Sequence, residues 1–156
     1  MKISKLIASV CLCYLVALLG SAVTLPSIST WYAGLNKPVF NPPNFIFGPV
    51  WTILYTLMGV ALYLVWDKEK KNKNVSRAIE IFLLQLSLNF LWSLVFFGLH
   101  QPFAALLTII ALWIGIFYTI ILFKKISKAA YLLIVPYLAW VSFALILNLF
   151  IVILNR

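Results

Sequence analysis

Tryptophan, tyrosine and amide side chains recur at helical spacing in three apolar stretches of the chain. Trp51 and Tyr55 lie four residues apart in one of them. Two further sets each share one face of a stretch: Gln85, Asn89, Trp92 and Phe96, and then Tyr137, Trp140, Ala144 and Asn148. Aromatic walls bury flat apolar surface, and a few amide groups fix its orientation. The pattern therefore predicts a pocket for a flat, largely apolar ligand.

The same residues also have a purely structural interpretation. An amide that faces lipid is costly, so Gln85, Asn89 and Asn148 are expected to face inward, where they would also serve as interhelical hydrogen-bond partners. Tryptophans gather at membrane–water boundaries as well. Trp31 and Trp66 fit that boundary role better than Trp140 does. The residues alone leave both interpretations open.

Five apolar stretches without a charged residue must position these side chains: 6–25, 50–66, 81–99, 103–123 and 129–154. A helix that crosses a bilayer needs about 20 such residues, with a range of about 17–25. Hydrophobic residues make up 65% of the chain, compared with roughly 45–50% in soluble domains. We therefore predict an all-α integral membrane protein, a five-transmembrane-helix bundle. Its expected helices are about 6–25, 49–66, 80–99, 103–123 and 129–154, in a single membrane domain covering 1–156.

The first stretch is expected to be a retained helix and not a signal peptide. Its apolar run is longer than the roughly 7–15 residues of a signal-peptide core. It also carries small residues every four positions, at Ser9, Cys13, Ala17 and Ser21. Small residues at this spacing allow close helix packing in lipid.

The basic residues are distributed as topology signals. A formal net charge of +9 would suggest nucleic acid in a soluble protein, but these residues lie in connections between stretches and form no single folded face. Ten of the twelve fall on one side of the expected membrane: Lys2, Lys5, Lys68, Lys70, Lys71, Lys73, Arg77, Lys124, Lys125 and Lys128. Lys37 and Arg156 fall on the other. The positive-inside rule then predicts a cytoplasmic amino terminus, and no nucleic-acid partner is expected.

The connection at residues 26–48 is expected to be an aromatic lid. It holds four prolines, at 26, 38, 42 and 43, together with five aromatic residues. Disordered linkers are poor in aromatic residues, and prolines reduce the entropy lost on ordering. Long loops in compact domains are commonly binding loops. Helix two is expected to begin at Pro49, where a missing N–H costs nothing.

The apolar stretches contain no Lys, Arg, Asp, Glu or His. The three acids, Asp67, Glu69 and Glu80, lie in or beside the second connection, and His100 lies in a short turn. Ion-coupled transport and acid–base catalysis usually need ionisable groups in the membrane or in a pocket. The two cysteines, at 11 and 13, do not make a metal site by themselves. We expect no metal and no cofactor.

A long ordered motif resembles the signature of the tryptophan-rich sensory protein/translocator protein family, also called peripheral benzodiazepine receptors. It runs Trp31-Tyr32-x-x-Leu35-x-Lys37-Pro38-x-Phe40-x-Pro42-Pro43 and continues Phe47-x-Pro49-Val50-Trp51-Thr52-x-Leu54-Tyr55. Two later segments extend it: Leu88-Asn89-x-x-Trp92 and Pro136-Tyr137-Leu138-Ala139-Trp140-x-x-Phe143-Ala144. The resemblance covers essentially the whole chain.

This resemblance implies a five-helix bundle, often a homodimer, with a pocket beneath the first loop. Members of the family bind porphyrins such as protoporphyrin IX, and synthetic isoquinoline carboxamides and benzodiazepines. By motif position the pocket residues would be Tyr32, Pro42, Pro43, Trp51, Asn89, Trp92, Trp140 and Ala144. Phe90 stands where the family has the first tryptophan of a Trp-x-Trp pair, which alters the stacking surface. Phe90, Tyr137 and Asn148 complete the expected ligand-binding set.

The resemblance also implies an activity and its alternatives. Some bacterial members are linked to light-dependent breakdown of protoporphyrin, and Trp51 and Trp140 match the tryptophans implicated there, which makes them the candidate catalytic residues. The alternatives are a tetrapyrrole transporter and a structural membrane subunit without a small ligand. Cholesterol binding is not expected, because residues 147–156 lack the tyrosine of the family's weak cholesterol motif. The expected location is the bacterial cell membrane.

Overall fold

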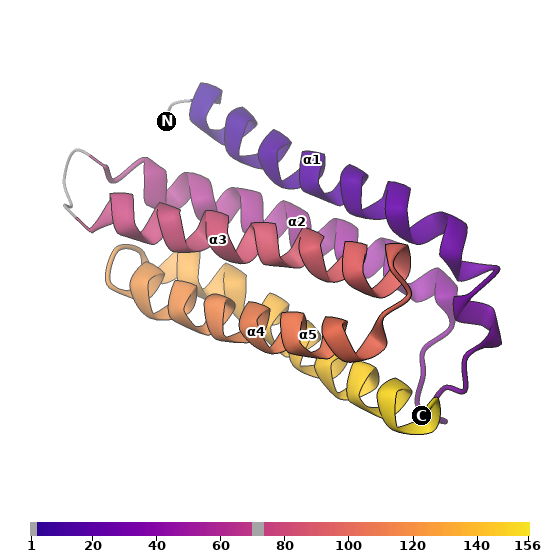
Figure 1. The fold of residues 1–156 in the computed structure, drawn as a ribbon. Coiled ribbons are helices and arrows are strands. Elements are labelled where there is room, and N and C mark those ends of the chain that lie inside the picture. The colour runs from indigo at the N-terminus through magenta and orange to yellow at the C-terminus, as the bar shows by residue number, and fades with distance from the viewer. Residues whose placement is uncertain (1–2, 70–73) are drawn as a thin grey trace.

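The structure, a computed structural model, describes residues 3–69 and 74–156, and these ranges form helices and connections without any strand (Figure 1). The long helices are α1 (Ile3–Ile28), α2 (Asn44–Trp66), α3 (Val75–Ser93), α4 (Pro102–Lys124) and α5 (Lys128–Leu154). A single 3-10 turn, η1 (Tyr32–Gly34), lies between α1 and α2, and π-helical turns, η2 (Leu94–Gly98), continue α3. All five are long and apolar enough to cross a membrane. The predicted fold class is confirmed.

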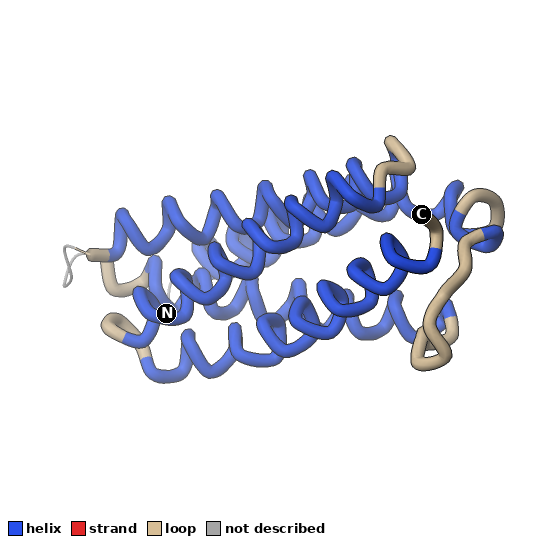
Figure 2. The backbone as a smooth tube through the Cα atoms, turned by 60° about the horizontal axis from the view of Figure 1, so that its bottom comes forward, coloured by secondary structure: helices blue, strands red, loops and turns tan. Residues whose placement is uncertain are grey.

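The helices pack as a closed ring in the order α1, α2, α5, α4, α3, seen from two sides in Figures 1 and 2. Large apolar side chains fill its interior, and Phe82, Phe123 and Tyr137 are completely buried. Other large apolar side chains point outward, such as Leu18 on α1 and Leu107 on α4, which are 67% and 57% exposed. An apolar exterior of this extent is the surface expected of a protein surrounded by lipid.

α1 reaches its neighbours through small side chains. Its buried residues are Ser9, Cys13, Gly20 and Ser27. Where α1 crosses α2, a Cβ added to Gly59 would lie 2.7 Å from the Cα atom of Val10, so glycine is required for this approach. The small-residue stripe predicted on α1 is buried at Ser9 and Cys13, but Ser21 is exposed. The closest approach of the two helices that glycine makes possible is thus at Gly59 and Val10.

Two helices begin five residues earlier than predicted. α2 begins at Asn44 and not at 49, and α3 begins at Val75 and not at 80. In α3 the reason is a buried face that starts at once, with Val75, Ala78 and Phe82 at i, i+3 and i+7. Pro49 lies inside α2, where its lack of an N–H removes one helical hydrogen bond near the start of the helix.

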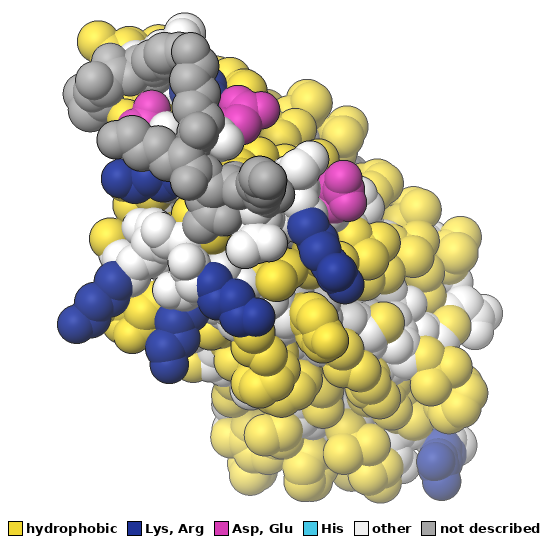
Figure 3. Space-filling view, turned by 90° about the vertical axis from the view of Figure 1, so that its left-hand side faces the viewer, with side chains coloured by type: hydrophobic (Ala, Val, Ile, Leu, Met, Phe, Trp, Pro, Cys, Tyr) yellow, Lys and Arg dark blue, Asp and Glu magenta, His cyan; other side chains and the backbone are white. Residues whose placement is uncertain are grey.

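The two ends of the bundle differ in charge. The amino terminus and the α2–α3 and α4–α5 connections lie at one end, and the carboxyl terminus and the other two connections lie at the opposite end (Figure 1). The first end carries these described basic residues: Lys5, Lys68, Arg77, Lys124, Lys125 and Lys128. Figure 3 shows the molecule from that end, with Lys and Arg side chains spread over the surface. Lys2, Lys70, Lys71 and Lys73, also assigned to this side from the sequence, lie outside the described residues.

Candidate functional site

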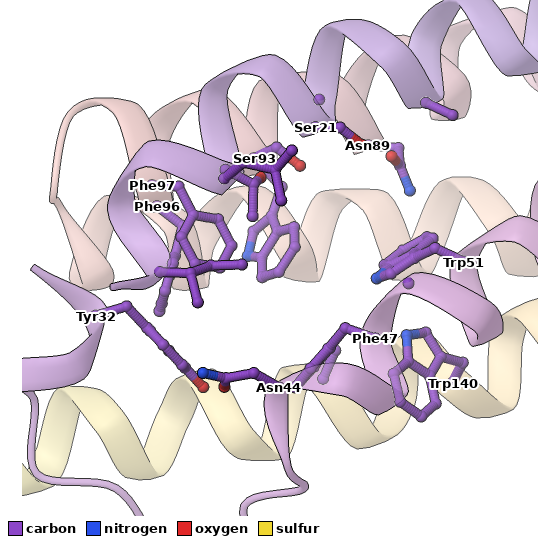
Figure 4. A pocket seen from close by; sticks show the side chains of 18 of the residues that line it. Ser21, Tyr32, Asn44, Phe47, Trp51, Asn89, Ser93, Phe96, Phe97 and Trp140 are labelled. Carbon is purple, nitrogen blue, oxygen red and sulfur yellow. The ribbon is translucent and has the colours of Figure 1, made fainter. Parts of the chain in front are cut away.

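A cavity of about 380 Å³ lies within the ring, next to the 29–43 connection that joins α1 to α2. Four helices and the connection itself supply its walls, and α4 supplies none of the described lining residues. The principal lining side chains, drawn in part in Figure 4, are Gly20, Ser21, Thr24, Tyr32, Asn44, Phe47, Trp51, Tyr55, Asn89, Trp92, Ser93, Phe96, Phe97, Trp140, Ala144, Leu147 and Asn148. The cavity is thus mainly aromatic, with a few hydroxyl and amide groups.

Two indole rings form one wall of the cavity. Figure 4 shows Trp51 of α2 and Trp140 of α5 together at the end of the cavity away from Tyr32. The Nε1 atom of Trp140 is buried and has no hydrogen-bond partner. An unpaired buried donor is costly, and a ligand that brings an acceptor would remove that cost. Trp140 packs edge-on against Phe47, with ring centroids 5.9 Å apart. This wall therefore offers flat apolar surface, with an unpaired indole N–H buried beside it.

The amides are engaged within the bundle. The Tyr55 hydroxyl donates to Asn89 Oδ1 at 2.6 Å, and Asn89 Nδ2 donates to the Tyr137 hydroxyl at 2.8 Å. Trp92 Nε1 donates to Asn148 Oδ1 at 3.1 Å, and Asn148 Nδ2 donates to the Pro102 carbonyl at 2.9 Å. These bonds hold α2, α3 and α5 together around the cavity and tie α5 to the start of α4. Both amides line the cavity, so both sequence interpretations, structural and ligand-facing, apply to them.

Tyr32 closes the cavity from the side of the connection. It is 5% exposed, and its ring lies 6.2 Å from that of Phe96 and 5.6 Å from that of Phe97. Its hydroxyl donates to Asn41 Oδ1 at 2.9 Å. Burial raises the pKa of Tyr32 above the ordinary value of 10.0. The side chain is therefore a neutral phenol under all ordinary conditions.

The 29–43 connection is held at three points, one within itself and two on the bundle. Lys37 Nζ donates to the carbonyls of Tyr32 and Leu35, at 2.7 and 3.0 Å. Asn36 and Asn155 exchange two hydrogen bonds: the Asn36 N–H donates to Asn155 Oδ1 at 2.9 Å, and Asn155 Nδ2 donates to the Asn36 carbonyl at 2.8 Å. The third point is at His100, in the turn between α3 and α4. Together they order a segment that the sequence indicated to be a lid.

His100 supplies the third point. It has a positive φ of 56°, an uncommon conformation for a residue with a side chain. Its ring stacks on Trp31 with centroids 4.5 Å apart, and its Nε2 lies 3.2 Å from Ser27 Oγ. Because the Ser27 hydroxyl donates to the Phe97 carbonyl at 2.6 Å, the histidine nitrogen must be the donor to Ser27. His100 and Trp31 thus join the α3–α4 turn to the segment that follows α1.

One edge of the cavity is open. Among the lining residues, Ser21 and Leu25 of α1 and Phe45 and Thr52 of α2 are exposed. Closer to the end of the bundle that holds the amino terminus, the Tyr14 hydroxyl of α1 lies 2.7 Å from Thr56 Oγ1 of α2 and bridges the two helices. The cavity therefore opens between α1 and α2 beside the connection and is closed below that bridge.

Some of the predicted site residues line the cavity, and the others lie outside its lining. The lining includes Tyr32, Trp51, Asn89, Trp92, Trp140, Ala144 and Asn148. It does not include Pro42, Pro43, Phe90 or Tyr137. Tyr137 is fully buried behind Trp51, with ring centroids 6.2 Å apart, and it supports the wall through Asn89. Phe90 lies one residue from Asn89 and so projects from a different face of α3.

Several lining residues were not identified from the sequence. α1 contributes Gly20, Ser21 and Thr24, and their only signal was a run of small and hydroxyl side chains in an otherwise aliphatic helix. Phe47 and Asn44 were missed because helix α2 was expected to start after them. The described residues contain no group of three or more His, Cys, Asp or Glu side chains placed to hold a metal ion. What the arrangement offers is stacking, hydrogen bonding and exclusion of water.

Comparison with known proteins shows which family this sequence matches. The model of the TspO/MBR family matches residues 9–154. The chain is 49% identical to the tryptophan-rich protein TspO of Archaeoglobus fulgidus over 155 residues, which is 99% of each chain. It is 46% identical to the protein of the same name from Chlorobaculum tepidum over 144 residues, 92% of this chain and 91% of the relative. The human translocator protein is 39% identical over 120 residues, 76% of this chain and 70% of the relative.

Proposed function

This chain belongs to the TspO/MBR family, and on that premise we propose that it is a membrane receptor whose cavity holds a flat ligand of the porphyrin class, protoporphyrin IX being the type. The observation that carries the proposal is the wall formed by Trp51 and Trp140, with an unpaired indole N–H at Trp140. Flat rings stack on indoles, and the carboxylates of a porphyrin are hydrogen-bond acceptors. Isoquinoline carboxamides and benzodiazepines share this combination of flat rings and an acceptor oxygen.

The ligand-binding test is a titration with protoporphyrin IX. Binding to the purified protein in detergent, followed through porphyrin absorbance and the quenching of tryptophan fluorescence, should saturate at a defined stoichiometry. Trp51→Phe should weaken it several-fold, because one potential donor and some stacking area are removed and a hydrogen bond is worth about 0.5–1.5 kcal/mol. Trp66→Phe, at the opposite end of α2 and outside the cavity lining, is the matched control. Equal affinity of the two variants would remove Trp51 from the site, and non-saturable uptake would favour a structural subunit.

A transporter of tetrapyrroles is the competing function. It requires a path through the bundle, whereas the interior beyond the cavity is filled by Met58, Phe82 and Ile134, all completely buried. Among the residues that the structure describes, no charged side chain is buried in the interior to couple movement to ions. Uptake of porphyrin into sealed vesicles that contain the protein, above the level of empty vesicles, would support the transporter instead.

We also propose that the bound porphyrin is broken down in light, with Trp51 and Trp140 as the reacting side chains. Both line the cavity. Trp51 lies 5.6 Å from the ring of Tyr55 and 6.2 Å from that of Tyr137, measured between centroids. An indole held against a photoexcited macrocycle is close enough to react with it or with the oxygen species it generates, and proximity of this kind supplies much of a rate enhancement.

The orientation in the membrane follows from the charged end of the bundle. We propose a bacterial-type cell membrane with the amino terminus in the cytoplasm and the 29–43 connection outside. After Cys11 and Cys13 are replaced by alanine, an impermeant maleimide added to intact cells should label Ser29→Cys and spare Lys68→Cys. The opposite labelling pattern would reverse the orientation. A homodimer stays a prediction, which sedimentation of the solubilised protein would test.

A further inference from the structure

A second groove lies at the end of the bundle opposite the cavity, between the start of α3 and the end of α4. Its volume is about 320 Å³, and its walls are Asn74, Arg77, Tyr118, Ile121, Leu122 and Lys125. Figure 3 shows this end of the molecule, with Lys and Arg side chains around apolar ones. The groove belongs neither to the cavity nor to the motif that the family resemblance uses.

The groove changes from charged to apolar along the axis of α4. Lys125 directly follows the last residue of α4, and Tyr118 precedes Lys125 by seven residues, which is roughly 10 Å along a helix. Tyr118 and Ile121 are 51% and 37% exposed. A cation at the rim and exposed apolar side chains roughly 6 to 10 Å below it match the headgroup and the upper acyl chain of a membrane lipid.

No acidic side chain is among the described residues that line the groove. Arg77 and Lys125 make no ion pair within the described residues, where the only one joins Lys5 to Glu69. The nearest acid along α3, Glu80, does not line the groove. Arg77 also lies in the first turn of α3, where the helix dipole adds positive potential instead of opposing it. The carboxyl-terminal end of α4, which also borders the groove, has the opposite dipole sign. The attraction of an anion to the groove therefore comes from the two cations.

We propose that this groove binds the phosphate of an anionic phospholipid, with an acyl chain lying against Tyr118 and Ile121. Basic pockets between transmembrane helices on the cytoplasmic side are known to bind anionic headgroups, and each nearby cation strengthens membrane binding by about fivefold. The apolar floor distinguishes a lipid from a free phosphate, because a free phosphate gains nothing from Tyr118 and Ile121.

The test is a titration of the purified full-length protein with phosphatidylglycerol, with bound lipid counted by native mass spectrometry. The double variant Arg77→Gln/Lys125→Gln should lose about tenfold or more in affinity. The matched control, Lys68→Gln/Lys128→Gln, removes two charges from the same end of the bundle but none from the groove lining. It should lose less than about threefold. Inorganic phosphate should not displace the lipid, and phosphatidylcholine should bind weakly to all forms.

Each other outcome overturns the proposal. Equal losses in the two double variants would show that surface charge acts without a site. Displacement by inorganic phosphate would identify a site for a soluble anion. Equal binding of phosphatidylcholine would remove the role of headgroup charge. Arg77→Lys/Lys125→Arg keeps both charges and should keep the affinity, and thermal unfolding together with porphyrin binding at the far end verifies that every variant is folded.

Discussion

Replacing both Trp51 and Trp140 with phenylalanine should abolish the porphyrin photoproduct that depends on the protein. Both residues line the cavity, and no titratable side chain does so apart from the phenols of Tyr14, Tyr32 and Tyr55. In the proposed mechanism the reaction depends on contact between the rings and on oxidation by light and oxygen. Phenylalanine keeps an apolar ring at each position but is far harder to oxidise than indole.

The measurement is the product spectrum after illumination of the protoporphyrin complex. Turnover should need both light and oxygen, and a chelator should leave it unchanged. Trp66→Phe/Trp113→Phe is the matched control, because it also removes two indoles and neither lines the cavity. Trp113 instead donates to Ser142 Oγ at 2.8 Å. If the Trp51/Trp140 variant binds porphyrin and gives the same product at the same rate, the tryptophan mechanism is wrong and the protein is a binder only.

The sequence identified the helices and part of the cavity wall because their physical signals are local. Uncharged runs long enough to cross a bilayer are read directly from composition, and the described structure has all five. Helical spacing then placed Trp140, Ala144 and Asn148 on one face of α5, and all three line the cavity. The same spacing placed Tyr137 with them, but in the structure Tyr137 lies behind the wall. Helical spacing identifies the side of the helix that faces inward. It does not tell which inward side chains reach the cavity and which pack against a neighbouring helix.

The features that the sequence did not reveal depend on partners distant along the chain. The Asn36–Asn155 pair spans 119 residues, and nothing local to either asparagine indicates the other. The place of α1 in the wall depends on how α1 packs against α2, α3 and η2, which no local pattern in α1 indicates. Gln85 is the reverse case: it is fully buried as expected, yet neither of its amide atoms has a hydrogen-bond partner. The described protein atoms alone therefore do not supply the pairing expected of a buried amide.

Filling the cavity from α5 should eliminate porphyrin binding without unfolding the bundle. Ala144 lies one turn from Trp140 and one turn from Asn148, and all three side chains line the cavity. A phenylalanine at 144 would place its ring between them and take up a large share of a cavity of about 380 Å³. A rigid macrocycle cannot reshape itself around that ring, so Ala144→Phe should weaken binding by about 100-fold, equivalent to about 2.7 kcal/mol.

The series Ala144→Val, Ala144→Leu and Ala144→Phe separates exclusion from misfolding. Affinity for protoporphyrin should fall with each increase in size, while the unfolding temperature changes little, because the added atoms enter open space and not a packed core. Ala139→Phe is the matched control: it lies on the same helix, is exposed, and does not line the cavity, so its affinity should equal that of the unmodified protein. Full-affinity binding by Ala144→Phe would mean that porphyrin binds elsewhere. In that case the wall of Trp51 and Trp140 would be packing alone, which is the structural interpretation that the residue pattern left open.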